Sequence, residues 1–222
     1  MSFEQIKKFE YSRYNIKHIF YNNNKKNDTL FISFAGKVDF YVNSTWFYKN
    51  DKINANFLFL KNDDNYDTYQ NNNYLNLINY YISKYDIKKI ITYGLSMGGI
   101  ASIYYGVLLK ADLIISIDPH PINYNIHTLY NLIDKTNFNF QKIFINYTFY
   151  DNSTKNNIPN HTNIIIEKLL LKNIFLTIQP YVCTKHLSFI PSKEYLINII
   201  STLSTKIVEN IDKNKNNNNI IL

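Results

Sequence analysis

Cysteine and glycine are scarce in this chain of 222 residues, and each scarcity excludes something. Cys183 is the only cysteine, so an internal disulfide is impossible and a reducing compartment, the cytoplasm, is expected. Only five glycines are present, so few positions can form a tight turn or a close backbone approach. Three of these five fall between residues 94 and 99, which makes this stretch the first place to search for a site.

Arginine is almost absent as well, because Arg13 is the only one although the formal net charge is +7. Bidentate recognition of phosphates and bases prefers arginine over lysine. The lysines are dispersed along the chain instead of forming a dense basic cluster, which is typical of a solvated surface. We therefore expect no nucleic-acid partner.

Long apolar runs are missing too. No window approaches the roughly 18 uninterrupted apolar residues of a membrane-spanning helix, and the first residues lack the apolar core of a secretion signal. Apolar residues nevertheless make up 45% of the chain, with 20 Tyr and 15 Phe, enough for an ample core. The expectation is a cytoplasmic protein without a membrane span, with one domain over 1–212 and a frayed, Asn-rich tail over 213–222.

Apolar strand-like runs alternate with segments of helical periodicity along the chain. Strands are expected within 9–21, at 29–34, 55–60, from 89, at 112–117, 142–150 and 174–181, and helices at 74–85, 98–110, 162–172 and 192–211. Near-continuous apolar strands between helices are typical of a parallel sheet that is covered on both faces. The predicted fold class is α/β, a three-layer α/β/α sandwich with a mostly parallel sheet of about seven or eight strands.

The sequence Gly94-Leu-Ser96-Met-Gly98-Gly99 lies between an apolar strand and a helix-forming segment. In this context Gly-x-Ser-x-Gly predicts a sharp turn that exposes a serine hydroxyl, with Ser96 as the nucleophile. The residues two before and two after the serine must be nearly free of side chain, which Gly94 and Gly98 satisfy. Gly99 lets the following helix pack closely on the sheet.

A serine hydroxyl becomes a good nucleophile when an imidazole takes its proton and a carboxylate orients that imidazole. His186 follows the last expected strand by a short loop, just before the final helix, and is the predicted base. Two aspartates that follow strands compete for the acid. Asp151, which follows the strand 142–150, is favoured, and Asp118, which follows 112–117, is the alternative.

Acyl transfer also needs two N–H donors for the developing oxyanion. Met97, the residue after the predicted nucleophile, is expected to supply one. The loop after the strand 29–34 is expected to supply the other, from either Gly36 or Lys37.

Three further residues are predicted to contact substrate. His120, rigidly held between two prolines, is assigned with Leu95 to the rim of the pocket. Trp46 belongs to an aromatic segment just past the oxyanion loop, where it could stack on a sugar. Packing in the core explains these aromatic residues equally well.

The order of glycine loop, serine elbow, acid and base resembles the α/β-hydrolase superfamily over roughly residues 9–210. The resemblance implies acyl-serine chemistry with neither a metal nor an organic cofactor. The interval between residues 119 and 141 leaves no room for a cap domain, and the His-Gly-Gly-Gly motif of one lipase and esterase branch is absent. The elbow is also loosely similar to that of bacterial surface-polysaccharide O-acetyltransferases, which use acetyl-CoA as a co-substrate.

The sequence therefore predicts a serine-dependent acyl-transfer enzyme, with hydrolysis of an ester or thioester as the first interpretation. The alternative is an O-acetyltransferase that moves acetyl from acetyl-CoA to a polysaccharide hydroxyl. A third interpretation is a non-catalytic binding or scaffold protein on the same fold. The expected partners are a small acyl ester, a thioester or a saccharide.

Overall fold

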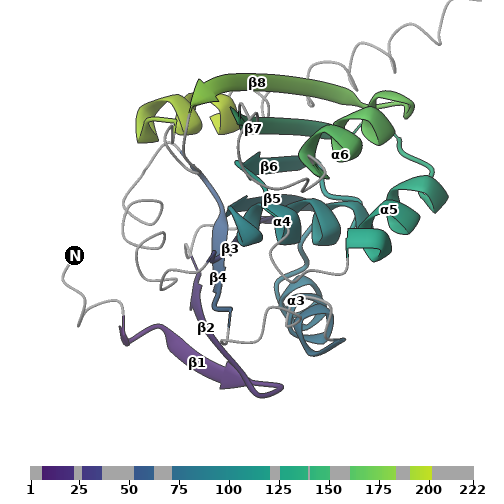
Figure 1. Cartoon of the computed structure of the whole chain (residues 1–222). Coiled ribbons are helices and arrows are strands. Elements are labelled where there is room, and N and C mark those ends of the chain that lie inside the picture. The colour runs from purple at the N-terminus through teal and green to yellow at the C-terminus, as the bar shows by residue number, and fades with distance from the viewer. Residues whose placement is uncertain are drawn as a thin grey trace, which may run out of the picture.

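The computed structural model describes residues 7–22, 27–36, 53–62, 72–120, 126–139, 141–150, 161–183 and 191–201. Within these residues the chain forms one eight-stranded sheet with helices on both faces (Figure 1). This architecture confirms the predicted α/β class and the three layers. The expected tail at 213–222 lies outside the described residues.

The strands follow one another across the sheet in the order β1-β2-β4-β3-β5-β6-β7-β8. Their bounds are β1 Glu10–Arg13, β2 Ile16–Tyr21, β3 Thr29–Phe34, β4 Asn56–Leu60, β5 Lys89–Leu95, β6 Leu113–Ile117, β7 Lys142–Tyr150 and β8 Phe175–Cys183. The pairs β1–β2 and β2–β4 are antiparallel, and all the others are parallel. The carboxyl ends of β3 to β8 therefore meet at one edge of the sheet, where ligands bind in folds of this kind.

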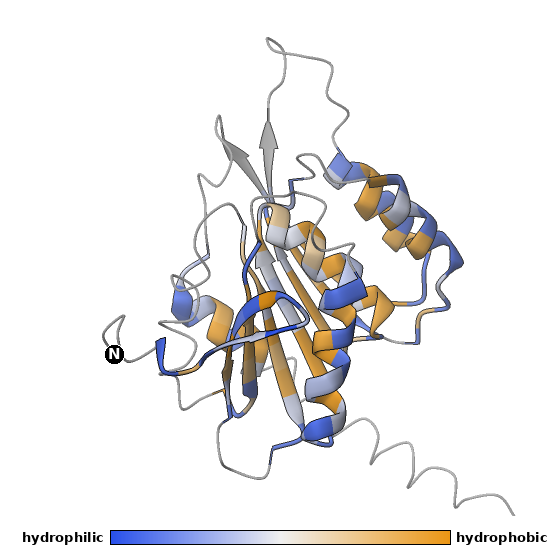
Figure 2. Ribbon diagram, turned by 90° about the horizontal axis from the view of Figure 1, so that it is seen from below, coloured by the Kyte–Doolittle hydropathy of each residue, from blue (hydrophilic) through white to orange (hydrophobic). Residues whose placement is uncertain are grey.

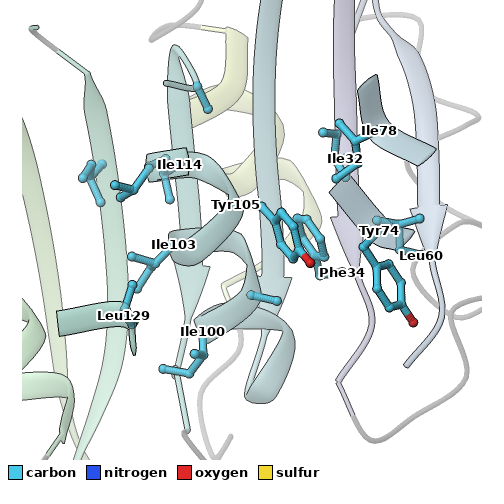
Figure 3. Packing of buried hydrophobic residues seen from close by; sticks show 14 of the residues in the cluster. Ile32, Phe34, Leu60, Tyr74, Ile78, Ile100, Ile103, Tyr105, Ile114 and Leu129 are labelled. Atoms are coloured by element: carbon cyan, nitrogen blue, oxygen red, sulfur yellow. The ribbon is translucent and has the colours of Figure 1, made fainter. Parts of the chain in front are cut away.

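Four labelled helices pack on one face of the sheet: α3 Asn72–Lys84, α4 Met97–Leu108, α5 Ile126–Lys135 and α6 His161–Leu170. Figure 3 shows this layer, in which Ile103 of α4 lies near Ile114 of β6 and Leu129 of α5. A further helix at 193–201 packs on the opposite face. Hydrophobic residues concentrate where sheet and helices meet (Figure 2), so burial of apolar surface holds the layers together.

The first strands are the expected antiparallel pair, joined by a two-residue turn. Tyr14 and Asn15 both have positive φ, 53° and 60°, as a type I′ hairpin turn requires. Strand β1 forms the edge of the sheet, whereas β2 pairs on both sides. No helix among the described residues is long and apolar enough to cross a membrane.

Candidate active site

Ser96 occupies the turn between β5 and α4 with a strained backbone, at φ 55° and ψ −120°. Positive φ is uncommon for a residue other than glycine. It costs about 1–3 kcal/mol and persists only where the surroundings hold the residue in place. Here the Ser96 N–H donates to the carbonyl of Ile117 at 2.9 Å. The Ser96 carbonyl accepts from the N–H groups of Gly99, at 2.9 Å, and His120, at 3.2 Å. The turn is thus fixed by its own helix and by the strand beside it.

The glycines on either side of Ser96 leave no room for a side chain. A Cβ on Gly94 would lie 1.9 Å from the carbonyl oxygen of Gly98. A Cβ on Gly98 would lie 2.2 Å from the carbonyl oxygen of Phe34, at the end of β3. A Cβ on Gly99 would lie 3.0 Å from Oγ of Ser116 in β6. The elbow can pack against two strands because these positions carry no side chain.

The predicted oxyanion residues lie on either side of this turn. Met97 is buried and begins α4. Gly36, two residues beyond β3, packs against the elbow, because its Cβ would lie 2.9 Å from the Leu95 carbonyl oxygen and 3.7 Å from Cβ of Ser96. The structure therefore brings Gly36, Leu95, Ser96 and Met97 together. Lys37 lies outside the described residues.

The segment after β6 brings the alternative acid close to the elbow. Leu95 pairs with Ile117, so Asp118 follows the sheet at the same level as Ser96. Asp118 is buried, has φ 44°, and donates its N–H to the carbonyl of Asn146 at 2.6 Å. His120, two residues after Asp118, is half-buried, and its backbone N–H donates to the Ser96 carbonyl.

The other predicted site residues, His186, Asp151 and Trp46, lie outside the described residues. The strands before His186 and Asp151 are described, and they end side by side, because Tyr150 pairs with Cys183. The segments that carry the predicted acid and base therefore leave the sheet at neighbouring points.

His127 and His161 lie in the first turns of α5 and α6, and the contact that each makes with Tyr130 was not predicted from the sequence. His161 begins α6, and its Nδ1 lies 2.9 Å from the hydroxyl oxygen of Tyr130 in α5. Burial lowers the pKa of His161, and the nearby His127 lowers it further. One signal in the sequence could have pointed to this contact. The helices that follow the adjacent strands β6 and β7 each carry a histidine in the first turn. Among the described residues, no group of three His, Cys, Asp or Glu side chains could hold a metal ion.

No protein-family model and no curated protein matches the sequence. Among solved structures, the Gap123 glycosylation-associated protein complex of Streptococcus agalactiae matches 90% of this chain and 46% of its own, at TM-score 0.65 and 11% identity. Acyl-protein thioesterase 2 of Zea mays matches 88% of this chain and 99% of its own, at TM-score 0.57 and 13% identity. Acetyl xylan esterase 1 of a Thermoanaerobacterium species matches 85% of this chain and 79% of its own, at TM-score 0.58 and 12% identity.

This chain thus spans about half the length of the Gap123 chain. At 11–13% sequence identity, the likeness to these structures shows a shared fold alone. Strand order, elbow and structural likeness agree, and the chain has the α/β-hydrolase fold.

Proposed function

We propose that this protein is a serine-dependent acyl-transfer enzyme that hydrolyses an ester or thioester through an acyl-Ser96 intermediate. The observation that carries the proposal is the backbone of Ser96, held at φ 55° at the carboxyl end of β5. A strained serine in a Gly-x-Ser-x-Gly turn before a helix is the arrangement that presents a nucleophile in this fold. The esterase and the thioesterase with similar folds support the same chemistry.

In the proposed mechanism, Oγ of Ser96 attacks the acyl carbonyl carbon while the His186 imidazole takes the hydroxyl proton. The N–H groups of Met97 and of Gly36 or Lys37 stabilise the negative oxygen, worth about 3 kcal/mol for each donor. The imidazolium then gives its proton to the departing alcohol or thiol. Water, deprotonated by the same imidazole, attacks the acyl-serine, releases the acid and restores the hydroxyl.

Asp151 is the proposed partner of the imidazole. The pairing of Tyr150 with Cys183 supports it, since the segments that follow these two residues begin next to each other. Asp118 is the alternative acid, supported by its burial beside the elbow. Leu95, His120 and Trp46 are the proposed substrate contacts.

O-acetyl transfer is the second candidate, with acetyl-CoA as acyl donor and a saccharide hydroxyl in place of water. It is favoured by the likeness to a glycosylation-associated complex and to an acetyl xylan esterase, whose names both concern carbohydrate. A cytoplasmic location, where acetyl-CoA is available, belongs to the same proposal. If acetyl-CoA turnover is indifferent to a saccharide acceptor, transfer is rejected and hydrolysis remains.

A fluorophosphonate probe tests the common core of both candidates. We expect it to label the wild-type protein and Ser12→Ala, in which an exposed serine is changed, but not Ser96→Ala. The mass of the intact protein after brief exposure to p-nitrophenyl acetate or acetyl-CoA should show an acetyl group that is absent in Ser96→Ala. A folded wild-type protein that is neither labelled nor acetylated would contradict the proposal and favour a non-catalytic scaffold.

A further inference from the structure

Helices α5 and α6 lie side by side (Figure 1). A ladder of side-chain contacts joins them. Near their first turns, the Tyr130 hydroxyl bonds to His161, and the ring of His127 stands edge-on to the Tyr130 ring at 5.9 Å. Near their last turns, Nζ of Lys168 forms an ion pair with Asp134 at 2.7 Å. The two ends of the ladder thus differ in chemistry, with imidazoles and a phenol at one end and an exposed ion pair at the other.

The imidazole end lies close to the elbow. Helices α5 and α6 follow β6 and β7, so both begin at the sheet edge that carries Ser96. The hydroxyl of Thr162, next to His161, donates to the carbonyl of Pro119 at 2.9 Å. The residue after Pro119 is His120, whose N–H donates to the Ser96 carbonyl. Two hydrogen bonds and one short loop therefore connect the first turn of α6 to the predicted nucleophile.

The hydrogen-bonded pair is uncharged near neutral pH. Burial and the neighbouring His127 lower the pKa of His161, and burial raises the pKa of Tyr130 to about 12. Because the phenol keeps its proton, we take the Tyr130 hydroxyl as the donor of this hydrogen bond and Nδ1 of His161 as the acceptor. The proton of the His161 imidazole is then on Nε2. The pair consequently presents a neutral N–H donor, beside the exposed imidazole of His127.

We propose that His161, oriented by Tyr130, and His127 form a saccharide subsite of the acyl-transfer site. The subsite binds the sugar whose hydroxyl carries or receives the acyl group. Neutral N–H groups and imidazole rings suit sugar hydroxyls and sugar CH faces, whereas an anionic ligand would need a cation, and Lys168 is paired with Asp134. This inference rests on the proposed function, because the subsite serves the reaction only if Ser96 is acylated.

Two substitutions of His161 separate ligand binding from helix packing. In His161→Asn the amide replaces Nδ1, which keeps the bond to Tyr130 but removes the Nε2 donor. In His161→Gln the longer amide replaces Nε2, which keeps the donor but loses the bond to Tyr130. We expect His161→Asn to raise KM for an acetylated xylo-oligosaccharide about tenfold with kcat nearly unchanged, and His161→Gln to raise it less than about threefold, since one hydrogen bond is worth about one factor of ten.

Lys172→Met is the matched control, because its Nζ donates to the Asp134 carbonyl at 2.8 Å, at the far end of the helix pair, and its loss should leave this KM unchanged. The reverse order, with Asn harmless and Gln impaired, would show that His161 only packs α5 against α6. Equal KM values in all variants would also overturn the subsite. Absence of Ser96-dependent turnover of p-nitrophenyl acetate would instead count against the proposed function. In that case, calorimetry with unacetylated xylo-oligosaccharide still tests the subsite. His161→Asn must bind the oligosaccharide more weakly than His161→Gln does, and equal binding rejects the subsite.

Discussion

At the scale of single residues, the geometry of the elbow depends on what glycine lacks. Ser96 is held at positive φ by the hydrogen bond from its N–H to Ile117 of β6 and by the close approach of the Phe34 carbonyl of β3 to Gly98. That approach requires glycine at 94 and 98, since a Cβ at either position would overlap a backbone carbonyl. The concentration of a scarce residue type in this stretch is therefore explained by steric contact.

We expect Gly98→Ala to lower the free energy of unfolding by at least about 3 kcal/mol, because its Cβ would meet backbone atoms that cannot move independently. Gly106→Ala in the same helix is the matched control. There the Cβ would lie 2.5 Å from Cγ1 of Ile114 and 2.7 Å from Oγ1 of Thr92, so it would meet side-chain atoms in place of the backbone. Alanine also favours the helix by about 1 kcal/mol at both positions. Urea unfolding should rank Gly98→Ala as clearly less stable, and equal losses would contradict the steric argument.

At the scale of elements, a buried histidine connects the first hairpin to α3. His18 in β2 has no exposed surface, and its Nδ1 lies 3.0 Å from the carbonyl oxygen of Ile16. Its Nε2 lies 2.8 Å from the hydroxyl of Tyr81 in α3. The neutral imidazole donates through Nδ1 and accepts at Nε2, so both ring nitrogens are satisfied without charge. Burial is the main reason why the pKa of His18 is lowered below its usual 6.5.

This lowered pKa predicts a pH dependence of stability. Below pH 6.5 the unfolded chain binds a proton at His18 more readily than the folded chain does. The contribution of His18 is therefore complete above pH 6.5 and is lost as the pH falls toward the folded pKa. Between pH 6.5 and 5, we expect unfolding free energy to fall more steeply in the wild type than in His18→Gln, by up to about 1.4 kcal/mol per pH unit. Parallel curves from urea titrations would exclude this role.

At the scale of the whole molecule, the sheet brings distant parts of the sequence to one place. Gly36, Ser96 and Asp118 follow three adjacent strands, and the register sets them at the same edge. The next two strands across the sheet, β7 and β8, also end together, at Tyr150 and Cys183. This edge of the sheet thus brings together Gly36, Ser96 and Asp118, and the strand that precedes Asp151 ends there too.

Comparing two aspartate substitutions tests which strand carries the acid. We expect Asp151→Asn to lower kcat about a thousandfold or more, because the imidazole would lose the carboxylate that orients it and stabilises its charge. Asp118→Asn should lower kcat far less. Both rates can be measured on p-nitrophenyl acetate, with urea unfolding as the control for folding. A larger effect in Asp118→Asn would move the role to the strand beside the elbow.

The fold could be predicted from the sequence because its signals are local. Apolar runs at 29–34 and 142–150 coincide with β3 and β7, and the other described strands and helices begin within about two residues of expectation, except α5, for which no helix was predicted. The strand, turn and helix around Ser96 were evident from the spacing of three glycines. Contacts between separate elements have no such local signal, which is why the bond between Tyr130 and His161 was not predicted.

The sequence by itself determined the alternation of strands and helices and the sharp turn at Ser96, because periodic burial and the steric demands of a turn act over a few neighbouring residues. Only the tertiary structure decided that Gly36 packs against the Leu95 carbonyl and that Asp118 lies level with Ser96. It also joined Thr162 to Pro119. These contacts depend on the order and register of the strands. Order and register are set by the packing of the whole core and not by any short stretch of sequence.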